Sequence, residues 1–240
     1  MRIFIFGGTR GLGLALAQHY LQNGHTVAIA GRNPTVSNTN LHYFALDIAD
    51  STAVQSALIE FAAAGLDLVI VTAGIYFNDR QNALDAAATR ALLETNINGL
   101  SHIMQHASAL MLAQGAGQIA AVASVAGLLA DYPGASVYSA TKRNVLQLCD
   151  TYQRALSGFG IGVTAIIPGY IDTERLRELN GGSARHKPFL VSEAFAVEKI
   201  VAAIANREVR CAFPWQMQLV VRLICVLPKW LQRLILLRKC

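Results

Sequence analysis

Short apolar runs alternate with helical patterns along most of the chain, beginning at the second residue. The runs are continuous rather than alternating with polar residues, which is typical of strands buried on both faces. Ala-rich stretches with apolar residues at helical spacing lie between or after them. Strands are therefore predicted at residues 2–6, 26–30, 41–46, 66–71, 118–123 and 162–167, and helices at 12–21, 52–64, 83–94 and 100–113.

Strands that alternate with helices predict an α/β fold, a doubly wound parallel sheet with helices on both faces and right-handed crossovers. A chain of 240 residues suffices for one large domain or two small ones. We expect a single domain at residues 1–212 and a tail at 213–240. The second crossover, residues 33–40, is rich in Asn, Pro, Ser and Thr, so a loop or a single turn is expected there.

Residues 95–130 contain no Asp, Glu, Lys or Arg, a pattern also seen in membrane spans. Polar side chains and a Gly-Ala-Gly turn interrupt this stretch, whereas a spanning helix needs about 20 mostly apolar residues. A buried helix, a turn and a central strand are therefore expected here.

The composition excludes several classes of protein. Apolar residues make up 53% of the chain and charged residues 15%, the opposite of the balance found in disordered chains. The four cysteines are scattered without metal-ligand or disulfide-scaffold spacing, which favours reduced thiols in the cytoplasm. The first apolar run leads straight into glycines, so no secretory leader is expected.

The net charge of +5 is concentrated near the carboxyl end, because residues 213–240 contain five bases and no acid. The other 15 bases balance the 15 acids of residues 1–212, and nucleic-acid binding by this body is not expected. The apolar and basic tail has two open interpretations. It is either an amphipathic anchor on a membrane surface or a helix packed on the body or on a second subunit.

A glycine-rich turn follows the first predicted strand and precedes a helix. Gly7, Gly11 and Gly13 have the spacing G-x-x-x-G-x-G. Glycines allow a tight turn, a close approach of backbone to a pyrophosphate, and close packing of helix on strand. The free N–H groups and the dipole of a helix N-terminus then favour phosphate. The motif therefore predicts a dinucleotide site.

The end of the second predicted strand indicates which nicotinamide cofactor binds. NAD requires an acid there for the ribose 2′-hydroxyl, but the chain reads Ala-Gly-Arg-Asn at residues 30–33. The guanidinium of Arg32 is suited to a 2′-phosphate, and Arg10 can approach it from the glycine turn. We therefore predict NADP(H).

Three further residues suggest proton-transfer chemistry. Ser124 follows the fifth predicted strand, and Tyr138 and Lys142 lie four residues apart, on one face of a helix. A nearby ammonium is expected to lower the pKa of the Tyr138 phenol from about 10 toward neutrality. Such a phenol exchanges a proton with a carbonyl or an alcohol, and the Ser124 hydroxyl can hold the same substrate oxygen.

With these motifs the chain resembles the short-chain dehydrogenase/reductase family from residue 1 to about 210. The resemblance implies a Rossmann-type single domain that transfers hydride between nicotinamide and a carbonyl or alcohol. It also rests on Ala73-Gly74, on the run Asn-Ile-Asn-Gly at residues 96–99, and on Pro-Gly-Tyr-Ile-Asp-Thr at 168–173.

The resemblance also implies individual roles. Tyr138 would be the general acid/base and Ser124 would orient the carbonyl. Lys142 would lower the pKa of Tyr138 and bind the nicotinamide ribose, and Asn96 would hold a water in a proton relay that ends at Lys142. The cofactor-binding residues would be Gly7, Thr9, Arg10, Gly11, Leu12, Gly13, Arg32, Asp47, Ile48, Ala73, Gly74, Tyr138, Lys142, Pro168, Gly169, Ile171 and Thr173.

Within this set, Asp47 and Ile48 resemble the pair that receives the adenine ring. Pro168, Gly169 and Ile171 would frame the nicotinamide through their backbone, with Thr173 near the carboxamide or the phosphates. Two departures affect stability or cofactor affinity more than chemistry. Phe6 stands where the family usually has Thr, and Val71-Thr72 stands where it usually has Asn-Asn.

The sequence therefore predicts an NADP(H)-dependent carbonyl reductase. A non-catalytic NADP(H)-binding regulator and a membrane-surface interaction protein are the alternatives. The residues expected beside the substrate are mostly apolar and aromatic, which favours a lipophilic carbonyl or alcohol. They are Tyr76, Phe77, Leu128, Leu129, Tyr132, Tyr170, Leu176 and Leu179.

Three further expectations concern assembly, mobility and metals. Residues 174–188 contain Gly-Gly and a basic run and are expected to form a mobile lid. The resemblance implies a homodimer or homotetramer. No metal site is expected, because His102 and His106 have no acid or Cys near them in sequence.

Overall fold

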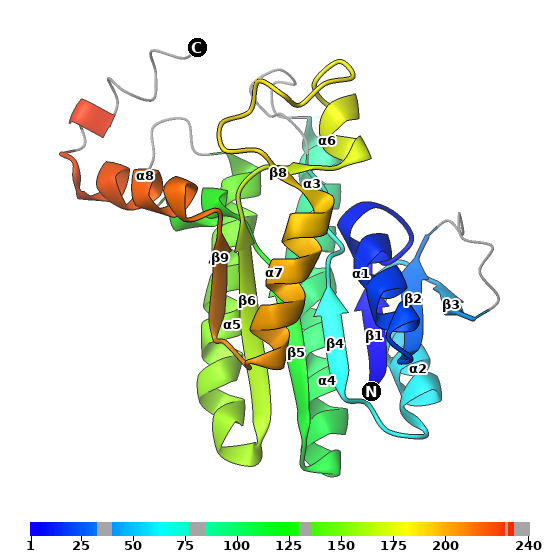
Figure 1. Cartoon of the computed structure of the whole chain (residues 1–240). Helices are drawn as coiled ribbons and strands as arrows, with labels where there is room; N and C mark the ends of the chain where they lie inside the picture. Colours follow the sequence, from blue (N-terminus) through cyan, green and yellow to red (C-terminus); the bar gives the residue numbers. More distant parts are fainter. Residues whose placement is uncertain (33–39, 77–84, 130–135, 229, 233–240) are drawn as a thin grey trace.

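The computed structural model describes residues 1–32, 40–76, 85–129, 136–228 and 230–232. In this part of the chain, parallel strands form a seven-stranded sheet in the order β3-β2-β1-β4-β5-β6-β9 (Figure 1). A second, two-stranded sheet pairs β7 (Ile171–Asp172) with β8 (Val191–Ser192). The strands of the main sheet are β1 (Arg2–Phe6), β2 (Thr26–Gly31), β3 (His42–Ala45), β4 (Leu68–Val71), β5 (Gly117–Val122), β6 (Ile161–Pro168) and β9 (Arg210–Phe213).

Helices cover both faces of the main sheet. The helices α1 (Gly11–Gln22) and α7 (Glu193–Ala205) lie on one face (Figure 1). The opposite face carries α2 (Ser51–Ala62), α4 (Leu100–Gln114) and α5 (Val137–Leu156). The remaining helices are α3 (Ala86–Leu93), the π-helix η1 (Glu94–Gly99), the 3-10 helices η2 (Val125–Leu128) and η3 (Ser157–Phe159), α6 (Glu174–Glu178) and α8 (Trp215–Val226).

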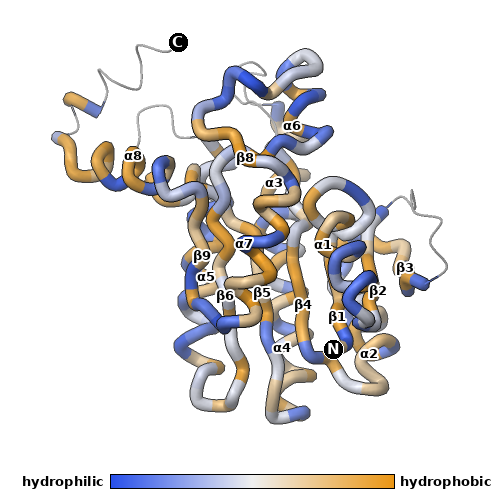
Figure 2. Tube along the Cα trace, viewed as in Figure 1, coloured by the Kyte–Doolittle hydropathy of each residue, from blue (hydrophilic) through white to orange (hydrophobic). Residues whose placement is uncertain are grey.

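The two-sided cover explains why the strand sequences are continuously apolar. Along β1, Phe4 and Phe6 pack under α2, α4 and α5, whereas Ile3 and Ile5 pack under α1 and α7. Successive side chains of a strand point to opposite faces, so both sets must be apolar. Figure 2 shows the hydrophobic colouring concentrated along these strands.

The strand order reverses between β1 and β4, and this reversal positions the site. From β1 the chain moves outward through β2 and β3, and then returns to place β4 on the other side of β1. Phe6 pairs with Val71 at the ends of these two strands, so the residues that follow each strand are neighbours. Open parallel sheets bind ligands at such a reversal, outside the carboxyl ends of the strands.

The predicted fold class is confirmed, and each of the six predicted strands corresponds to an observed one. The seventh strand, β9, was missed because its four residues, Arg-Cys-Ala-Phe, carry no clear period. It extends to Phe213, one residue beyond the predicted domain boundary, and pairs with β6. The predicted second crossover lies almost wholly outside the described residues.

Substituting Phe4 with Ala tests the packing under β1. Phe4 is fully buried, stacks on Phe6 with ring centroids 4.4 Å apart, and also contacts Phe44 and Phe61. We expect Phe4→Ala to lower the free energy of unfolding by about 3–5 kcal/mol in urea denaturation, because it leaves a cavity. Phe159, which is 61% exposed, is the matched control, and Phe159→Ala should change it by less than about 0.5 kcal/mol.

Candidate active site

The turn between β1 and α1 brings three backbone segments into close approach. Gly7 has φ +89°, and a Cβ there would lie 2.5 Å from the amide nitrogen of Ala73. A Cβ on Gly13 would lie 2.3 Å from the carbonyl oxygen of Gly7. Gly11 has φ +50°, and a Cβ there would meet nothing within 4 Å. The turn is therefore closely packed toward the sheet, with open space at Gly11.

The amino end of α1 is suited to an anion. Arg10 occupies the N-cap position with an extended backbone, and no side chain caps the helix there. The first turn contains no acidic residue. The first N–H groups of a helix have no partner within the helix, and with its dipole they favour a phosphate. The glycine turn thus fits the pyrophosphate of a dinucleotide.

Thr72 braces this turn and was not singled out as a site residue from the sequence. Its hydroxyl donates to the carbonyl oxygen of Phe6 at 3.1 Å, and the amides of Thr72 and Ala73 donate to the same oxygen at 2.9 Å. The Phe6 side chain itself is buried in the core. Phe6 itself has no hydroxyl that could brace the turn, and the Thr72 hydroxyl braces it from just after β4. A hydroxyl residue directly after a buried strand was the signal available in the sequence.

Arg32 lies at the end of β2, at the exposed edge of the site. Its guanidinium is 3.9 Å from the carboxylate of Asp47, and both side chains are exposed. Asp47 also accepts a hydrogen bond from the amide of Ala49, which holds the turn after β3. The side chain of Ile48 is buried, and a Cβ on Gly99 would lie 2.5 Å from it. Ile48 therefore contributes to the core, and only Asp47 of this pair presents its side chain near Arg32.

A cleft of about 190 Å³ collects the expected catalytic side chains. Ser124 follows β5 and begins η2, and Tyr138 and Lys142 lie one turn apart on α5. The hydroxyls of Ser124 and Tyr138 are hydrogen-bonded. The cleft is lined by Thr72, Gly74, Ile75, Tyr76, Val122, Ala123, Ser124, Tyr138, Lys142, Pro168 and Gly169.

Burial dominates the electrostatics of this cleft. Burial raises the pKa of Tyr138 to about 12, and its hydrogen bond with Ser124 acts in the opposite direction. Burial also lowers the pKa of Lys142 to about 8. The Lys142 ammonium donates to the carbonyl oxygen of Val122 at 2.8 Å and lies 5.9 Å from the centre of the Tyr138 ring. The expected fall in the pKa of Tyr138 is therefore wrong for this structure, because burial raises this pKa and the Lys142 ammonium does not lower it.

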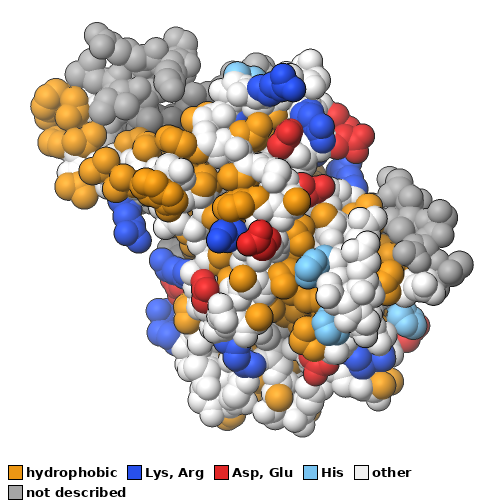
Figure 3. Space-filling model, viewed as in Figure 1, with side chains coloured by type: hydrophobic (Ala, Val, Ile, Leu, Met, Phe, Trp, Pro, Cys, Tyr) orange, Lys and Arg blue, Asp and Glu red, His pale blue; other side chains and the backbone are white. Residues whose placement is uncertain are grey.

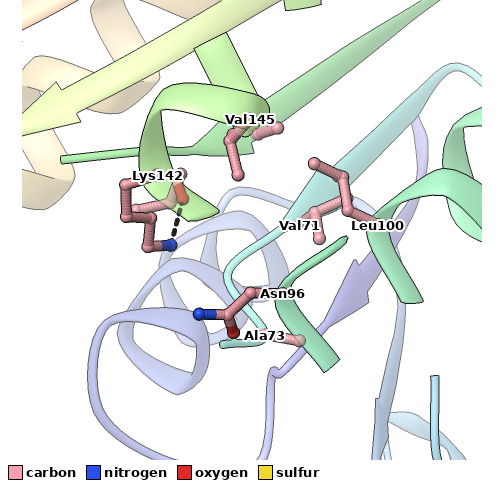
Figure 4. Close-up of a pocket in the computed structure, with 8 residues that line it drawn as sticks. Val71, Ala73, Asn96, Leu100, Lys142 and Val145 are labelled. Atoms are coloured by element: carbon pink, nitrogen blue, oxygen red, sulfur yellow. Dashed lines mark hydrogen bonds between the residues drawn. The ribbon is translucent and has the colours of Figure 1, made fainter. Parts of the chain in front are cut away.

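Behind Lys142 a small cavity has room for about one water molecule. Lys142 and Val145 of α5 line one side of it, and Asn96 and Leu100 line another (Figure 4). A Cβ on Gly74 would lie 3.4 Å from both the Asn96 side-chain oxygen and the Lys142 nitrogen. The predicted proximity of Asn96 to Lys142 thus holds in the structure.

Asn96 is fixed by three hydrogen bonds. Its side-chain oxygen accepts from the amide of Ile75 at 2.7 Å, and its side-chain nitrogen donates to the carbonyl of Ile75 at 2.9 Å and to the Thr141 hydroxyl at 3.1 Å. It lies in the π-helix η1, a distortion frequent at functional sites. The side chain therefore joins the end of β4 to α5.

Thr141 is a second residue that the sequence did not single out. It is fully buried, and its hydroxyl donates to the carbonyl of Tyr138 at 2.8 Å while accepting from Asn96. It thereby links the helical turn that carries Tyr138 and Lys142 to Asn96. The signal available in the sequence was a hydroxyl residue between the Tyr and the Lys.

The other expected cofactor residues lie on several elements. Pro168 is the last residue of β6, Gly169 follows it, and both line the cleft. Ile171 is half-buried in β7, and the hydroxyl of Thr173 caps α6 by accepting from Leu176. Thr9 packs over the end of β2, where a Cβ on Gly31 would lie 2.7 Å from its methyl group. Leu12 of α1 packs on the core beneath α1 and α7.

Aromatic residues border the substrate side of the cleft. The Tyr76 ring meets the Tyr138 ring edge to face, with centroids 4.8 Å apart. Tyr170 is 37% exposed and influences the pKa of Tyr138. Leu128 packs partly on the core, and Leu176 and Leu179 lie on and just after α6. The expected substrate residues Phe77 and Tyr132 lie outside the described residues.

The comparisons with known proteins agree with this geometry. A family model described as short chain dehydrogenase matches residues 1–184. The chain belongs to the short-chain dehydrogenase/reductase family. An uncharacterized oxidoreductase of Myxococcus xanthus is 28% identical over 236 residues, which cover 93% of this chain and 91% of the relative.

Solved structures show the same fold. A short-chain dehydrogenase of Burkholderia cenocepacia, in complex with NADP, matches with a TM-score of 0.80 and 23% identity, covering 94% of this chain and 92% of that one. A gluconate 5-dehydrogenase of the same organism, in complex with NADP and tartrate, matches with a TM-score of 0.77 and 26% identity. That match covers 90% of this chain and 94% of the other.

Substituting Lys142 with Met tests the buried ammonium. Below pH 8, Lys142 is charged in both the folded and the unfolded protein. The folded protein therefore bears the full cost of burying the ammonium. Between pH 8 and the ordinary lysine pKa near 10.4, only the unfolded state keeps the proton, so stability rises with pH. The unfolding free energy of the native protein should rise relative to Lys142→Met across this window, by at most ~1.4 kcal/mol per pH unit. Parallel stability curves, measured by urea denaturation between pH 7 and about 10, would contradict this expectation.

Proposed function

We propose that this protein is an NADP(H)-dependent oxidoreductase that transfers hydride between nicotinamide and a lipophilic carbonyl or alcohol. The observation that carries the proposal is the convergence of Ser124, Tyr138 and Lys142 on one cleft, next to Gly74 and Gly169. These residues come from two elements, β5 with its following turn and α5. Because these side chains come from separate elements, their convergence indicates a shared chemical role rather than the stabilisation of a single helix or strand.

The bound cofactor would supply or accept the hydride, and the side chains would manage the proton. The Tyr138 hydroxyl, held by Ser124, would donate its proton to the substrate oxygen in reduction and accept one in oxidation. The Ser124 hydroxyl would hold the same oxygen. Asn96 would hold a water in the small cavity, and this water would return a proton through the Lys142 ammonium to replace the one that Tyr138 donates. Thr141 would position both Tyr138 and Asn96.

A raised pKa suits Tyr138 to the direction of reduction. With a pKa of about 12 the phenol is protonated at neutral pH and ready to donate. Oxidation needs the phenolate, which must be stabilised by positive charge brought closer than Lys142 lies here. The protonated phenol is therefore the form of Tyr138 that would act in reduction, and the phenolate the form that would act in oxidation.

Three observations support NADP(H) over NAD(H). Arg32 is exposed at the end of β2, where an NAD site would present an acid, and Arg10 is exposed at the glycine turn. Asp47 lies 3.9 Å from Arg32, but it is fixed in its own turn by Ala49. The gluconate 5-dehydrogenase structure, 26% identical, contains NADP. Its tartrate ligand belongs to that enzyme and carries no argument for the substrate here.

The aromatic border of the cleft supports a lipophilic substrate. The Tyr76 ring lines the cleft and meets the Tyr138 ring edge to face, and Tyr170, which is 37% exposed, lies near enough to affect the pKa of Tyr138. The catalytic body would comprise residues 1–212 together with Phe213, which ends β9, and the tail would begin with α8, packed on the body through Met217 and Val221. A homodimer or homotetramer, a cytoplasmic location and a lid at 174–188 stay predictions.

A turnover assay tests the proposed chemistry. NADPH oxidation would be followed by absorbance with apolar ketones, aldehydes and quinones. We expect Tyr138→Phe to reduce kcat/KM by about 1,000-fold while NADPH still binds, because only the proton donor is lost. Tyr152→Phe, on the same helix but packed on the core, is the matched control and should keep turnover within about two-fold.

Equal activity of Tyr138→Phe and the native protein would overturn the proposed role of the phenol. Bound NADPH with no turnover across the panel would favour the regulator alternative. The two failures are distinguishable, because the first shows chemistry without Tyr138 and the second shows no chemistry.

Arg32→Ala tests the cofactor preference. Loss of the guanidinium should weaken NADPH binding by about ten- to a hundred-fold and leave NADH binding nearly unchanged, because only NADPH carries the 2′-phosphate. Binding would be measured by titrating the native protein and the variant with both cofactors. Arg90→Ala, at an exposed position on α3, is the control for a general charge effect. Equal or tighter binding of NADH by the native protein would contradict the preference.

A further inference from the structure

Helix α8 presents an apolar face that the rest of the described chain leaves uncovered. Met217 and Val221 are buried against the body. On another face, Trp215, Leu219 and Leu223 are 67%, 50% and 59% exposed. With Val226, at 85% exposed, they have the spacing i, i+4, i+8, i+11, which places them on one side of a helix. Figure 3 shows hydrophobic side chains gathered over α8. We call these four residues the α8 face.

The helix that carries this face is anchored to the body. The side chain of Gln218 donates to the carbonyl oxygen of Ala212 in β9. The thiol of Cys225 lies 3.7 Å from the carbonyl oxygen of Leu128 in η2. A Cβ on Gly169, which lines the cleft, would lie 3.5 Å from Met217. Helix α8 therefore has a fixed orientation, and its buried side, not the α8 face, adjoins Gly169 of the cleft.

The charge of residues 213–240 indicates what kind of surface covers the α8 face. Residues 213–240 contain Arg222, Lys229, Arg233, Arg238 and Lys239 and no acid. Arg222 is exposed, and it lies three residues after Leu219 and four before Val226, so it is a base on the α8 face itself. Pairing this segment with the same segment of a second copy would bring ten positive charges together, which is unfavourable. An anionic surface is attracted by the same charges.

Both tryptophans of the chain belong to this segment. Trp215 begins the α8 face, and Trp230 is 64% exposed just beyond α8. Tryptophan is enriched where an apolar phase meets water, because its ring is apolar and its N–H needs a polar partner. No helix in the described ranges is long and apolar enough to cross a membrane. An apolar face with flanking bases on a short helix is typical of a helix lying in a membrane interface.

We propose that the α8 face docks this protein on the surface of an anionic lipid bilayer, with α8 lying in the plane of the interface. The apolar side chains enter the boundary between headgroups and acyl chains, and the bases contact the anionic headgroups. The proposal does not depend on the catalytic function, because it needs only α8 and its charge.

The tryptophans give a direct test with the full-length protein. Fluorescence would be recorded with vesicles of phosphatidylcholine containing about 30% phosphatidylglycerol, and with vesicles of phosphatidylcholine alone. We expect a blue shift and at least about ten-fold weaker iodide quenching with the anionic vesicles only. Raising the salt from about 0.1 to 0.5 M should weaken this binding.

Matched variants distinguish lipid binding through the α8 face from nonspecific adsorption of exposed apolar residues. Leu219→Glu combined with Leu223→Glu should reduce co-sedimentation with anionic vesicles by at least about ten-fold. Phe159→Glu, at a residue that is 61% exposed on η3, should leave it unchanged. Circular dichroism would show that both variants are folded, since all three positions are exposed.

Three outcomes would overturn the proposal. The first is equal binding to anionic and neutral vesicles, and the second is equal binding by the Leu219/Leu223 and Phe159 variants. The third is a tryptophan shift that grows with protein concentration in the absence of lipid, together with a dimer in analytical ultracentrifugation. That result would assign the α8 face to a second copy of the chain.

Discussion

The candidate active site depends on the hydrogen bonds that the Phe6 carbonyl oxygen accepts. This oxygen accepts hydrogen bonds from the amides of Thr72 and Ala73 and from the Thr72 hydroxyl, and so joins the ends of β1 and β4. This junction lies where the strand order reverses. Because Gly7 and Gly13 have no side chains, the turn, β4 and α1 approach within distances that a Cβ would prevent. The glycine turn proposed to hold the dinucleotide depends on this meeting of three backbone segments.

A chain of polar contacts extends from this junction into the catalytic cleft. Ile75, just beyond β4, holds the side chain of Asn96, and Asn96 donates to Thr141. Thr141 in turn donates to the backbone of Tyr138. The π-helix that presents Asn96 is thereby tied to α5, which carries both titrating groups. Buried polar groups are nearly always hydrogen-bonded. This series of hydrogen bonds therefore fixes the positions of Asn96 and Tyr138 as well as filling space.

Burial sets the chemistry of the cleft more strongly than charge pairing does. Tyr138 is kept protonated and Lys142 is made easier to deprotonate, both because water is excluded. The same exclusion strengthens every interaction with a substrate oxygen. On the other side of Gly169, α8 turns an apolar face outward instead. The molecule thus combines a cleft whose titratable side chains are buried with an exposed apolar surface on α8.

The strand sequences alone determined the fold class, since continuous apolar runs between helices satisfy only a sheet covered on both faces. The spacing of Gly7, Gly11 and Gly13, and of Tyr138 and Lys142, indicated the candidate site, because tight turns and one-turn helical pairs are local features. Only the tertiary structure decided the contacts of Thr72 and Thr141, whose partners lie 66 and 45 residues away. It also decided that the pKa of Tyr138 is raised rather than lowered, since desolvation depends on everything packed around a group.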